Sequence, residues 1–286
     1  MQVDGCAAGG QEFHNTRLPA PRASAAGRRV QEELNRICRH RPQRKEDGRC
    51  YNARGAFRKT VFYMLELGVK FLISYFIGSL MGAMIVGRLR GGVDIRTMGS
   101  GNAGGTNALR TQGLLFALFV VVIDVGKGVI GAGIVPGLEL PLVPTDPEVS
   151  RVWLMMCCAA AAVIGHVWPI YHKFNGGKGA ATFIGTLVVL DPALIIEVLL
   201  VWAVVVALTG YVGLASMTAA TSLPLWLGIT RLPDDQPLFI YSVAMAMFII
   251  YCHRSNIQRM RQGVENRHTK LMLFGRKGVN TSDDAA

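Results

Sequence analysis

Apolar runs separated by short polar loops recur along most of this chain, and they constrain its fold more than any other feature. The first run, residues 71–87, has 17 residues without a charge, the lower limit for a helix that crosses a bilayer; residues 67–70 lengthen it. Six more runs cover residues 114–135, 152–171, 180–190, 193–209, 217–230 and 238–252. Backbone polar groups in lipid must be bonded internally, so these runs predict helices. We therefore expect an all-α integral membrane protein with about seven transmembrane helices.

The charge content agrees with a membrane protein. Only 17% of residues are charged, against about 25% in soluble domains, and the mean hydropathy is +0.33. Most of the net charge of +11 comes from residues 1–60, which hold 13 Lys and Arg against 6 Asp and Glu. Basic residues beside apolar spans report membrane orientation, so we expect no nucleic-acid binding. The six cysteines show no metal-ligand spacing, so we expect neither a disulfide framework nor a metal site.

The loops divide into a basic set and an acidic set. Loops 88–111, 172–179 and 210–216 and the C-terminal segment fall on one side of the predicted membrane and carry most of the Arg and Lys. The opposite loops are acidic. Because cytoplasmic loops are the basic ones, the sequence predicts a multi-pass protein whose glycine-rich loops are cytoplasmic.

Residues 1–63 differ from the rest of the chain. They are polar, Arg-rich and without sustained periodicity, which is typical of disorder. The predicted topology places this basic tail outside, although such a tail resists translocation, and Met64 would serve as a start codon. We expect a dispensable extension over 1–63, a transmembrane domain over 64–267 and a short polar tail over 268–286.

Residues 99–107 read GSGNAGGTN and are followed by Arg110. Small residues let the backbone turn tightly and bring N–H groups close to a phosphate. An arginine fork matches phosphate oxygens. A dinucleotide-binding fingerprint also matches formally, but an apolar span precedes it and no βαβ unit follows. A phosphate-holding loop is therefore favoured over an ordinary connection between helices.

A second glycine-rich loop centres on Lys178, which Gly176, Gly177 and Gly179 flank. It is not a Walker A loop, because glycine rather than Ser or Thr follows the lysine. A lysine held among glycines suits an organic phosphate, with a solvated lysine as the alternative. His253 follows the last apolar run on the same face and suits a general base or a hydrogen-bond donor; an interfacial anchor is the alternative.

Asp124 and Lys127 fall within one apolar run at i and i+3. Intramembrane charges are costly and are usually paired or functional, and we favour mutual pairing. No histidine has an aspartate five residues later, which excludes the acid/base dyad of acyltransferases that use thioesters.

Several motifs together resemble the bacterial acyl-phosphate:glycerol-3-phosphate acyltransferase (PlsY-like) family. They are GS at 78–79, DIR at 94–96, GSGNAGGTNALR at 99–110, GHVWP at 165–169, KFNGGKGAAT at 173–182, YVGLAS at 211–216 and YCHRSNIQR at 251–259. The match runs from residue 64 to about residue 267. It implies a seven-helix bundle in the bacterial cytoplasmic (inner) membrane that transfers an acyl group from acyl phosphate to the 1-hydroxyl of sn-glycerol 3-phosphate. The products are lysophosphatidic acid and phosphate.

The resemblance also implies roles for individual residues. It implies that Ser100, Arg110 and Lys178 hold glycerol 3-phosphate and that His253 and Asn256 orient its glycerol part. The matching positions expected to bind substrate are Gly101, Asn102, Gly104, Gly105, Thr106, Asn107, Gly176, Gly177, Gly179, Ser216 and Lys127. No cofactor or metal is implied. The partners implied are the two substrates, membrane lipids and the enzyme that makes acyl phosphate from acyl carrier protein.

Two positions depart from the family pattern, which usually has Pro where Met81 stands and Ser where Gly213 stands. We expect Gly213 to support the turn as a serine would. Two functions of other classes compete: a transporter for an organic phosphate, favoured by the intramembrane charges, and a lipid-binding scaffold without catalysis. The glycine-rich loops share one face and no inverted repeat is evident, which disfavours the transporter.

Overall fold

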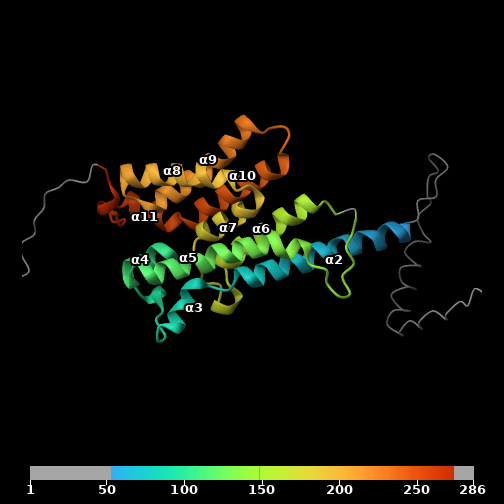
Figure 1. The fold of residues 1–286 in the computed structure, drawn as a ribbon, viewed down its shortest axis with the longest axis horizontal. Helices are drawn as coiled ribbons and strands as arrows, with labels where there is room; N and C mark the ends of the chain where they lie inside the picture. Colours follow the sequence, from blue (N-terminus) through green and yellow to red (C-terminus); the bar gives the residue numbers. More distant parts are fainter. Residues whose placement is uncertain (1–52, 148, 274–286) are drawn as a thin grey trace, which may run out of the picture. The chain divides into compact units, whose positions relative to one another are not determined.

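The computed structural model describes residues 53–147 and 149–273, so most of the predicted N-terminal extension, Glu148 and residues 274–286 lie outside the described residues. Within this part the chain is helical, apart from one isolated bridge between Leu140 and Val143 (Figure 1). The α-helices are α2 (Ala53–Gly78), α3 (Gly82–Leu89), α4 (Gly105–Gln112), α5 (Leu114–Val129), α6 (Arg151–Val167), α7 (Ala180–Leu190), α8 (Ala193–Thr209), α9 (Val212–Thr230), α10 (Gln236–Cys252) and α11 (Arg254–Arg261). The predicted all-α class is confirmed.

Three helical segments of the described residues are long and apolar enough to cross a membrane, namely Leu114–Gly137, Arg151–His172 and Val212–Thr230. The number rises to five if two bent pairs, α2 with α3 and α10 with α11, each count as one span. Two shorter apolar helices, α7 and α8, have 11 and 17 residues. Large apolar side chains are exposed on α5 and α8, including Leu118, Ile196 and Leu200. Such an outer surface suits lipid rather than water.

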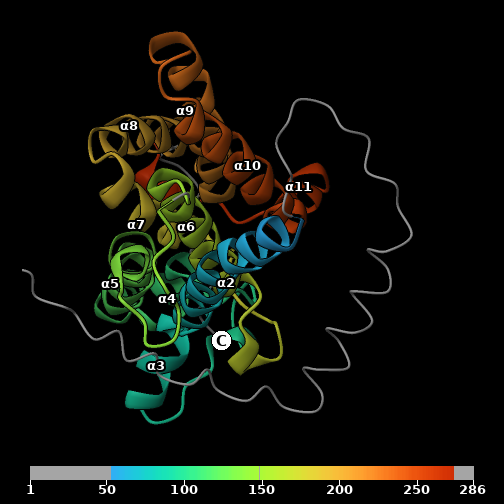
Figure 2. The same cartoon turned by 90° about the vertical axis from the view of Figure 1, so that its right-hand side faces the viewer.

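The helices lie in three groups (Figures 1 and 2). Helices α8, α9 and α10 form one side, α2 to α5 form the other, and α6 and α7 lie between them. The central apolar core joins α6, α7, α9 and α10 and includes Phe183, Leu187, Leu223 and Ile249. Glycines bring neighbouring helices close: a Cβ on Gly78 would lie 2.2 Å from the carbonyl oxygen of Ala162. Small residues are typical of packed helices in membranes.

The structure corrects the prediction of a continuous first span. Helix α2 ends at Gly78, α3 begins at Gly82, and the two axes differ by 41°. At the break, Lys127 Nζ donates to the Leu80 carbonyl at 2.9 Å, and Gly82 N donates to Asp124 Oδ1 at 3.2 Å. Asp124 and Lys127 also pair with each other at 3.0 Å, so the predicted pairing is confirmed. Side chains from α5 thus satisfy backbone groups that a continuous helix would satisfy itself.

Candidate active site

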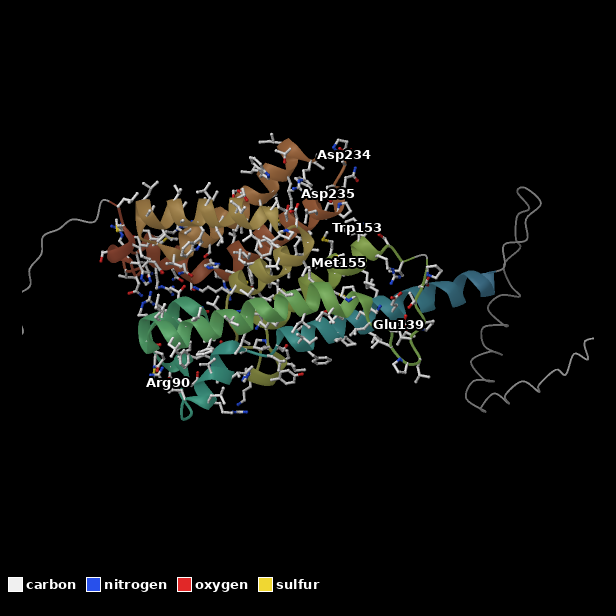
Figure 3. The ribbon with its side chains drawn as sticks, viewed as in Figure 1. Arg90, Glu139, Trp153, Met155, Asp234 and Asp235 are labelled. Carbon is white, nitrogen blue, oxygen red and sulfur yellow. The ribbon has the colours of Figure 1, made fainter. Side chains whose placement is uncertain are left out.

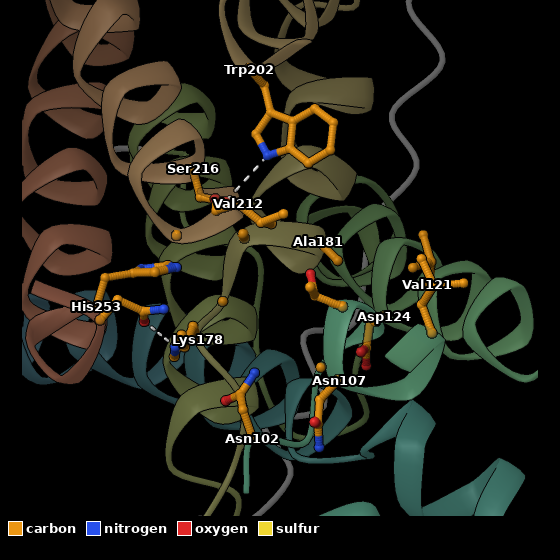
Figure 4. Close-up of a pocket in the computed structure, with 18 of the residues that line it drawn as sticks. Asn102, Asn107, Val121, Asp124, Lys178, Ala181, Trp202, Val212, Ser216 and His253 are labelled. Carbon is orange, nitrogen blue, oxygen red and sulfur yellow. Dashed lines mark hydrogen bonds between the residues drawn. The ribbon is translucent and has the colours of Figure 1, made fainter. Parts of the chain in front are cut away.

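The largest cluster of predicted site residues lines one cavity of about 510 Å³ (Figure 4). Asn102, Asn107, Lys178 and His253 surround one part of it, whereas Trp202 lies across from Asn102. The predicted residues that line it are Ser100, Asn102, Gly104, Gly105, Thr106, Asn107, Arg110, Lys178, Gly179, Ser216, His253 and Asn256. Its other wall is apolar and includes Leu118, Val121, Phe183, Leu199 and Trp202. One cavity therefore combines a polar end with an apolar wall.

The loop at 99–107 is organised by the side chain of Asn107, which is 1% exposed. Its Oδ1 accepts from Ser100 N at 2.9 Å, and its Nδ2 donates to the carbonyls of Ile95 at 2.8 Å and Met98 at 3.0 Å. Gly101 has φ +70°, a conformation that glycine adopts without strain. Gly101 shapes the loop without lining the cavity. Asn107 lines the cavity, but these bonds commit its amide to the loop itself.

Three helices begin at the polar end of the cavity, and the bend between α10 and α11 lies there too. The first residues of α4, α7 and α9 line it, as do His253 before α11 and Asn256 within α11. The first N–H groups of a helix lack partners within the helix, and the helix dipole adds partial positive charge there. The exposed Arg110 and the half-buried Lys178 lie at the same end. This end of the cavity is built for anions.

Lys178 begins a chain of polar contacts along the cavity wall. Its Nζ donates to Asn256 Oδ1; Asn256 Nδ2 donates to Glu265 Oε1 at 2.8 Å, and Glu265 Oε2 pairs with Arg259 Nε at 2.6 Å. Burial, reinforced by the positive charges of Arg259 and Arg110, lowers the pKa of Lys178 to about 8. A lysine so destabilised as a cation gains strongly from an incoming anion. Arg259 is thus paired with Glu265 at the edge of the cavity.

His253 is oriented by the end of α10. It is 4% exposed, and its Nδ1 lies 2.8 Å from the carbonyl oxygen of Ile249. A carbonyl only accepts hydrogen bonds, so Nδ1 carries the hydrogen, and in the neutral ring Nε2 has a free lone pair. His253 can therefore accept a proton or a hydroxyl hydrogen through Nε2.

The second glycine-rich loop packs on His166. Gly177 N donates to the His166 carbonyl at 3.1 Å, and a Cβ on Gly177 would lie 2.1 Å from His166 Nε2. Gly179 has φ +86° and precedes α7. Gly176 and Gly177 thus place Lys178 without lining the cavity themselves.

Two other predicted binding residues have structural contacts. Lys127 is 4% exposed, bonds Leu80 and Asp124, and does not line the cavity. Ser216 lines the cavity, while its hydroxyl donates to the Val212 carbonyl at 3.0 Å and receives the Trp202 indole N–H at 3.3 Å (Figure 4). Both therefore support the site from the helices around it.

Sequence reasoning missed several residues of the cavity wall, among them Asp124, His166, Gly213 and His268. The turn assigned to Gly213 is instead made by Gly210, with φ +73°. Gly213 lies in α9, where a Cβ would come 2.6 Å from Asn256 Nδ2. A glycine at this position is a sequence signal of close packing, but only the fold shows that the neighbour is Asn256. Among the described residues, no group of three or more His, Cys, Asp or Glu could hold a metal ion.

Comparison with known proteins agrees with this geometry. A family model described as glycerol-3-phosphate acyltransferase matches residues 69–263. The glycerol-3-phosphate acyltransferase of Chlorobaculum tepidum is 35% identical over 235 residues, covering 75% of this chain and 100% of that protein. That of Salinibacter ruber is 38% identical over 216 residues, covering 71% of this chain and 93% of that protein.

The fold is also similar to two crystal structures of PlsY, an integral membrane glycerol 3-phosphate acyltransferase. The glycerol 3-phosphate form gives a TM-score of 0.59 and the lysophosphatidic acid form 0.58, each at 30% identity over 70% of this chain and 94% of that chain. These matches confirm the resemblance found in the motifs. The chain belongs to the glycerol-3-phosphate acyltransferase family.

Proposed function

We propose that the protein transfers a fatty acyl group from acyl phosphate to the sn-1 hydroxyl of glycerol 3-phosphate, the first step of phospholipid synthesis. The observation that carries this proposal is the cavity itself: three helix N-termini with Arg110 and Lys178 at one end, and an apolar wall beside them. Two phosphorylated substrates need such an anion-binding site, and one of them carries an acyl chain that needs an apolar wall.

Glycerol 3-phosphate is assigned to the part of the cavity between α11 and the second glycine-rich loop on one side and Ser100 and Arg110 on the other. Arg110, Ser100 and Lys178 bind its phosphate, and His253 and Asn256 orient its glycerol part. The exposed guanidinium of Arg110 has no ion-pair partner among the residues the structure describes, so it is free to bind an anion. Charge-assisted hydrogen bonds of this kind are the stronger ones in proteins.

The phosphate of the acyl donor is assigned to the start of α4. Residues 104–107 line the cavity there, and the first N–H groups of α4 are free of helical partners. The chain of the donor lies along the apolar wall formed by α5, α7 and α8. The reacting carbonyl then lies between the two phosphate sites.

The reaction needs no acyl-enzyme intermediate, because phosphate is already a good leaving group. The glycerol hydroxyl oxygen attacks the acyl carbonyl carbon, an ester C–O bond forms, and the bond from carbonyl carbon to phosphate oxygen breaks. Positive groups and N–H donors stabilise the charge that develops, and positioning supplies much of the remainder. The hydroxyl proton passes to a substrate phosphate oxygen, with Nε2 of His253 as the rival acceptor.

We infer that seven helices cross the bacterial cytoplasmic membrane, with the cavity mouth on the cytoplasmic face. Figure 3 places Glu139, Asp234 and Asp235 toward one end of the helices and Arg90 toward the other. An acidic outer end and a basic inner end follow the positive-inside rule. A cytoplasmic mouth would accept acyl phosphate from the enzyme that makes it from acyl carrier protein.

The test is a defined assay with protein purified in detergent. Acyl phosphate and glycerol 3-phosphate together should release phosphate and lysophosphatidate, while acyl-CoA in place of acyl phosphate should give no product. R110A and K178A should abolish turnover while remaining folded, because both side chains act through charge in the cavity. Product from acyl-CoA, or near-normal turnover in either variant, would contradict the proposal. Transport without turnover would favour the competing transporter.

A further inference from the structure

Residues 264–273 follow α11 and lie just beyond the segment that the family model matches, which ends at 263. We call this segment the C-terminal strap. It crosses the turn between α8 and α9: His268 N donates to the Gly210 carbonyl and Leu273 N to the Ala207 carbonyl, both at 2.9 Å. The guanidinium carbon of Arg267 lies 4.6 Å from the centre of the Tyr211 ring. The strap is thus held by backbone hydrogen bonds and a cation–π contact.

The strap brings one histidine to the cavity. His268 lines it together with Glu265 and Leu271. Its Nε2 is buried and has no hydrogen-bond partner among the residues of 53–147 and 149–273. A buried polar atom without a partner is costly and therefore calls for an explanation.

The contacts that hold the strap in place do not require a histidine side chain at position 268. The anchors at Gly210 and Ala207 use backbone N–H groups, which almost any residue would supply. Arg110 lines the same cavity as His268. Burial first, and then the positive charge of Arg110, lowers the pKa of His268. The neutral form of the ring is favoured, and in one of its two tautomers it can donate from Nε2 into the cavity that Arg110 also lines.

We propose that His268 is a further substrate-binding residue, whose Nε2–H donates to a phosphate oxygen of the substrate held beside Arg110. This inference rests on the proposed function. Because Arg110 is assigned to glycerol 3-phosphate, that substrate is the favoured partner, and the phosphate of the acyl donor is the other source of the same chemistry. Loss of a hydrogen bond to a charged group then weakens binding about tenfold or more.

The test compares three variants with the wild-type protein. H268L removes the donor; H268Q keeps an amide N–H near the position of Nε2; T269A alters an exposed neighbour on the strap that does not line the cavity. KM and kcat are measured with each substrate varied in turn. Binding of glycerol 3-phosphate is measured by calorimetry and thermal stability by a melting curve in detergent.

We expect H268L to raise KM for glycerol 3-phosphate about tenfold, with kcat and melting temperature unchanged. H268Q should recover most of the binding, and T269A should match the wild type. A rise confined to KM for acyl phosphate would support a hydrogen bond from His268 to a substrate phosphate, and would assign that phosphate to acyl phosphate. Unchanged KM values in H268L would overturn the inference. The inference would also be overturned if H268L and H268Q both weakened glycerol 3-phosphate binding and both lowered the melting temperature, because that result indicates a structural role for His268.

The calorimetric measurement separates this inference from the proposed function. If wild-type protein gives no product from acyl phosphate, the proposed reaction fails, but the effect of H268L on glycerol 3-phosphate binding still decides the role of His268. If wild-type protein is active and H268L binds glycerol 3-phosphate and acyl phosphate normally, only the inference on His268 fails.

Discussion

Lys178 shows how one residue can make catalysis depend on pH. Its pKa is lowered to about 8, first by burial and then by Arg259 and Arg110, so the free enzyme loses this cation as the pH rises through that value. In the proposed site, the cationic form is the one that binds a phosphate dianion. We therefore expect kcat/KM for glycerol 3-phosphate to fall above pH 8, by up to about tenfold per pH unit, in assays from about pH 7 to about pH 10.

The matched variant for this prediction is K178R. Arginine stays charged throughout this range, so the decline assigned to Lys178 should disappear even if the variant is slower at every pH. A flat wild-type profile, or an identical decline in K178R, would show that another group controls the rate.

Asn107 illustrates a residue whose position in a motif suggests binding, although its contacts indicate support. Its three hydrogen bonds hold the loop at Ser100, Ile95 and Met98. In N107D the carboxylate cannot donate to the two carbonyls, and each unsatisfied buried group costs about 1–3 kcal/mol. We expect N107D to lower both the melting temperature and the activity, whereas R110A lowers the activity alone. An N107D protein as stable as the wild type would mean that the amide serves substrate instead.

At the scale of helices, glycines set how closely α5 and α7 approach, and α7 begins at Gly179 beside Lys178. A Cβ on Gly128 would lie 2.2 Å from the Thr182 carbonyl oxygen, whereas a Cβ on Gly126, two residues away on α5, meets nothing within 4 Å. We expect G128A to push α7 away, reducing activity and melting temperature, and G126A to be neutral or slightly stabilising through helix propensity. Equal behaviour of the two variants in a melting curve would refute this view of the packing.

The helices and the glycine-rich loops were predictable from the sequence, but the joints between them were not. Apolar runs predict where helices lie because lipid forces backbone groups to bond internally. The break after Gly78 falls at a Gly-Ser pair, where helices often kink, but the sequence does not show that Asp124 and Lys127 reach across from α5 to satisfy it. In the same way Glu265 and His268 enter the site only because the chain folds back over the turn at Gly210. Long-range contacts of this kind leave no local pattern.

At the scale of the whole chain, the two ends of the helices differ in how their charged groups are used. One end holds ion pairs around a buried glutamate, and the other holds the positive groups of the cavity. Away from the cavity, Glu66 is 1% exposed and pairs with Lys70 at 2.8 Å and Arg151 at 2.7 Å, which ties α2 to the start of α6. Lys70 also donates to the Pro136 carbonyl at 2.7 Å. Glu66 and Lys70 both follow Met64, so a chain that starts at Met64 would keep this network. The cavity end instead holds positive groups with free N–H donors, as an anion site requires.

The proposed orientation of these ends can be tested with single cysteines in a variant whose six native cysteines are replaced. Asp234 and Arg90 are both exposed and lie toward opposite ends (Figure 3). If the acidic end is outside, a membrane-impermeant maleimide should label D234C in intact cells, and should label R90C only after the membrane is permeabilised. The reason is the positive-inside bias, which retains Arg-rich loops in the cytoplasm. Labelling of R90C in intact cells would reverse the orientation, and the cavity would then open away from any acyl phosphate made in the cytoplasm.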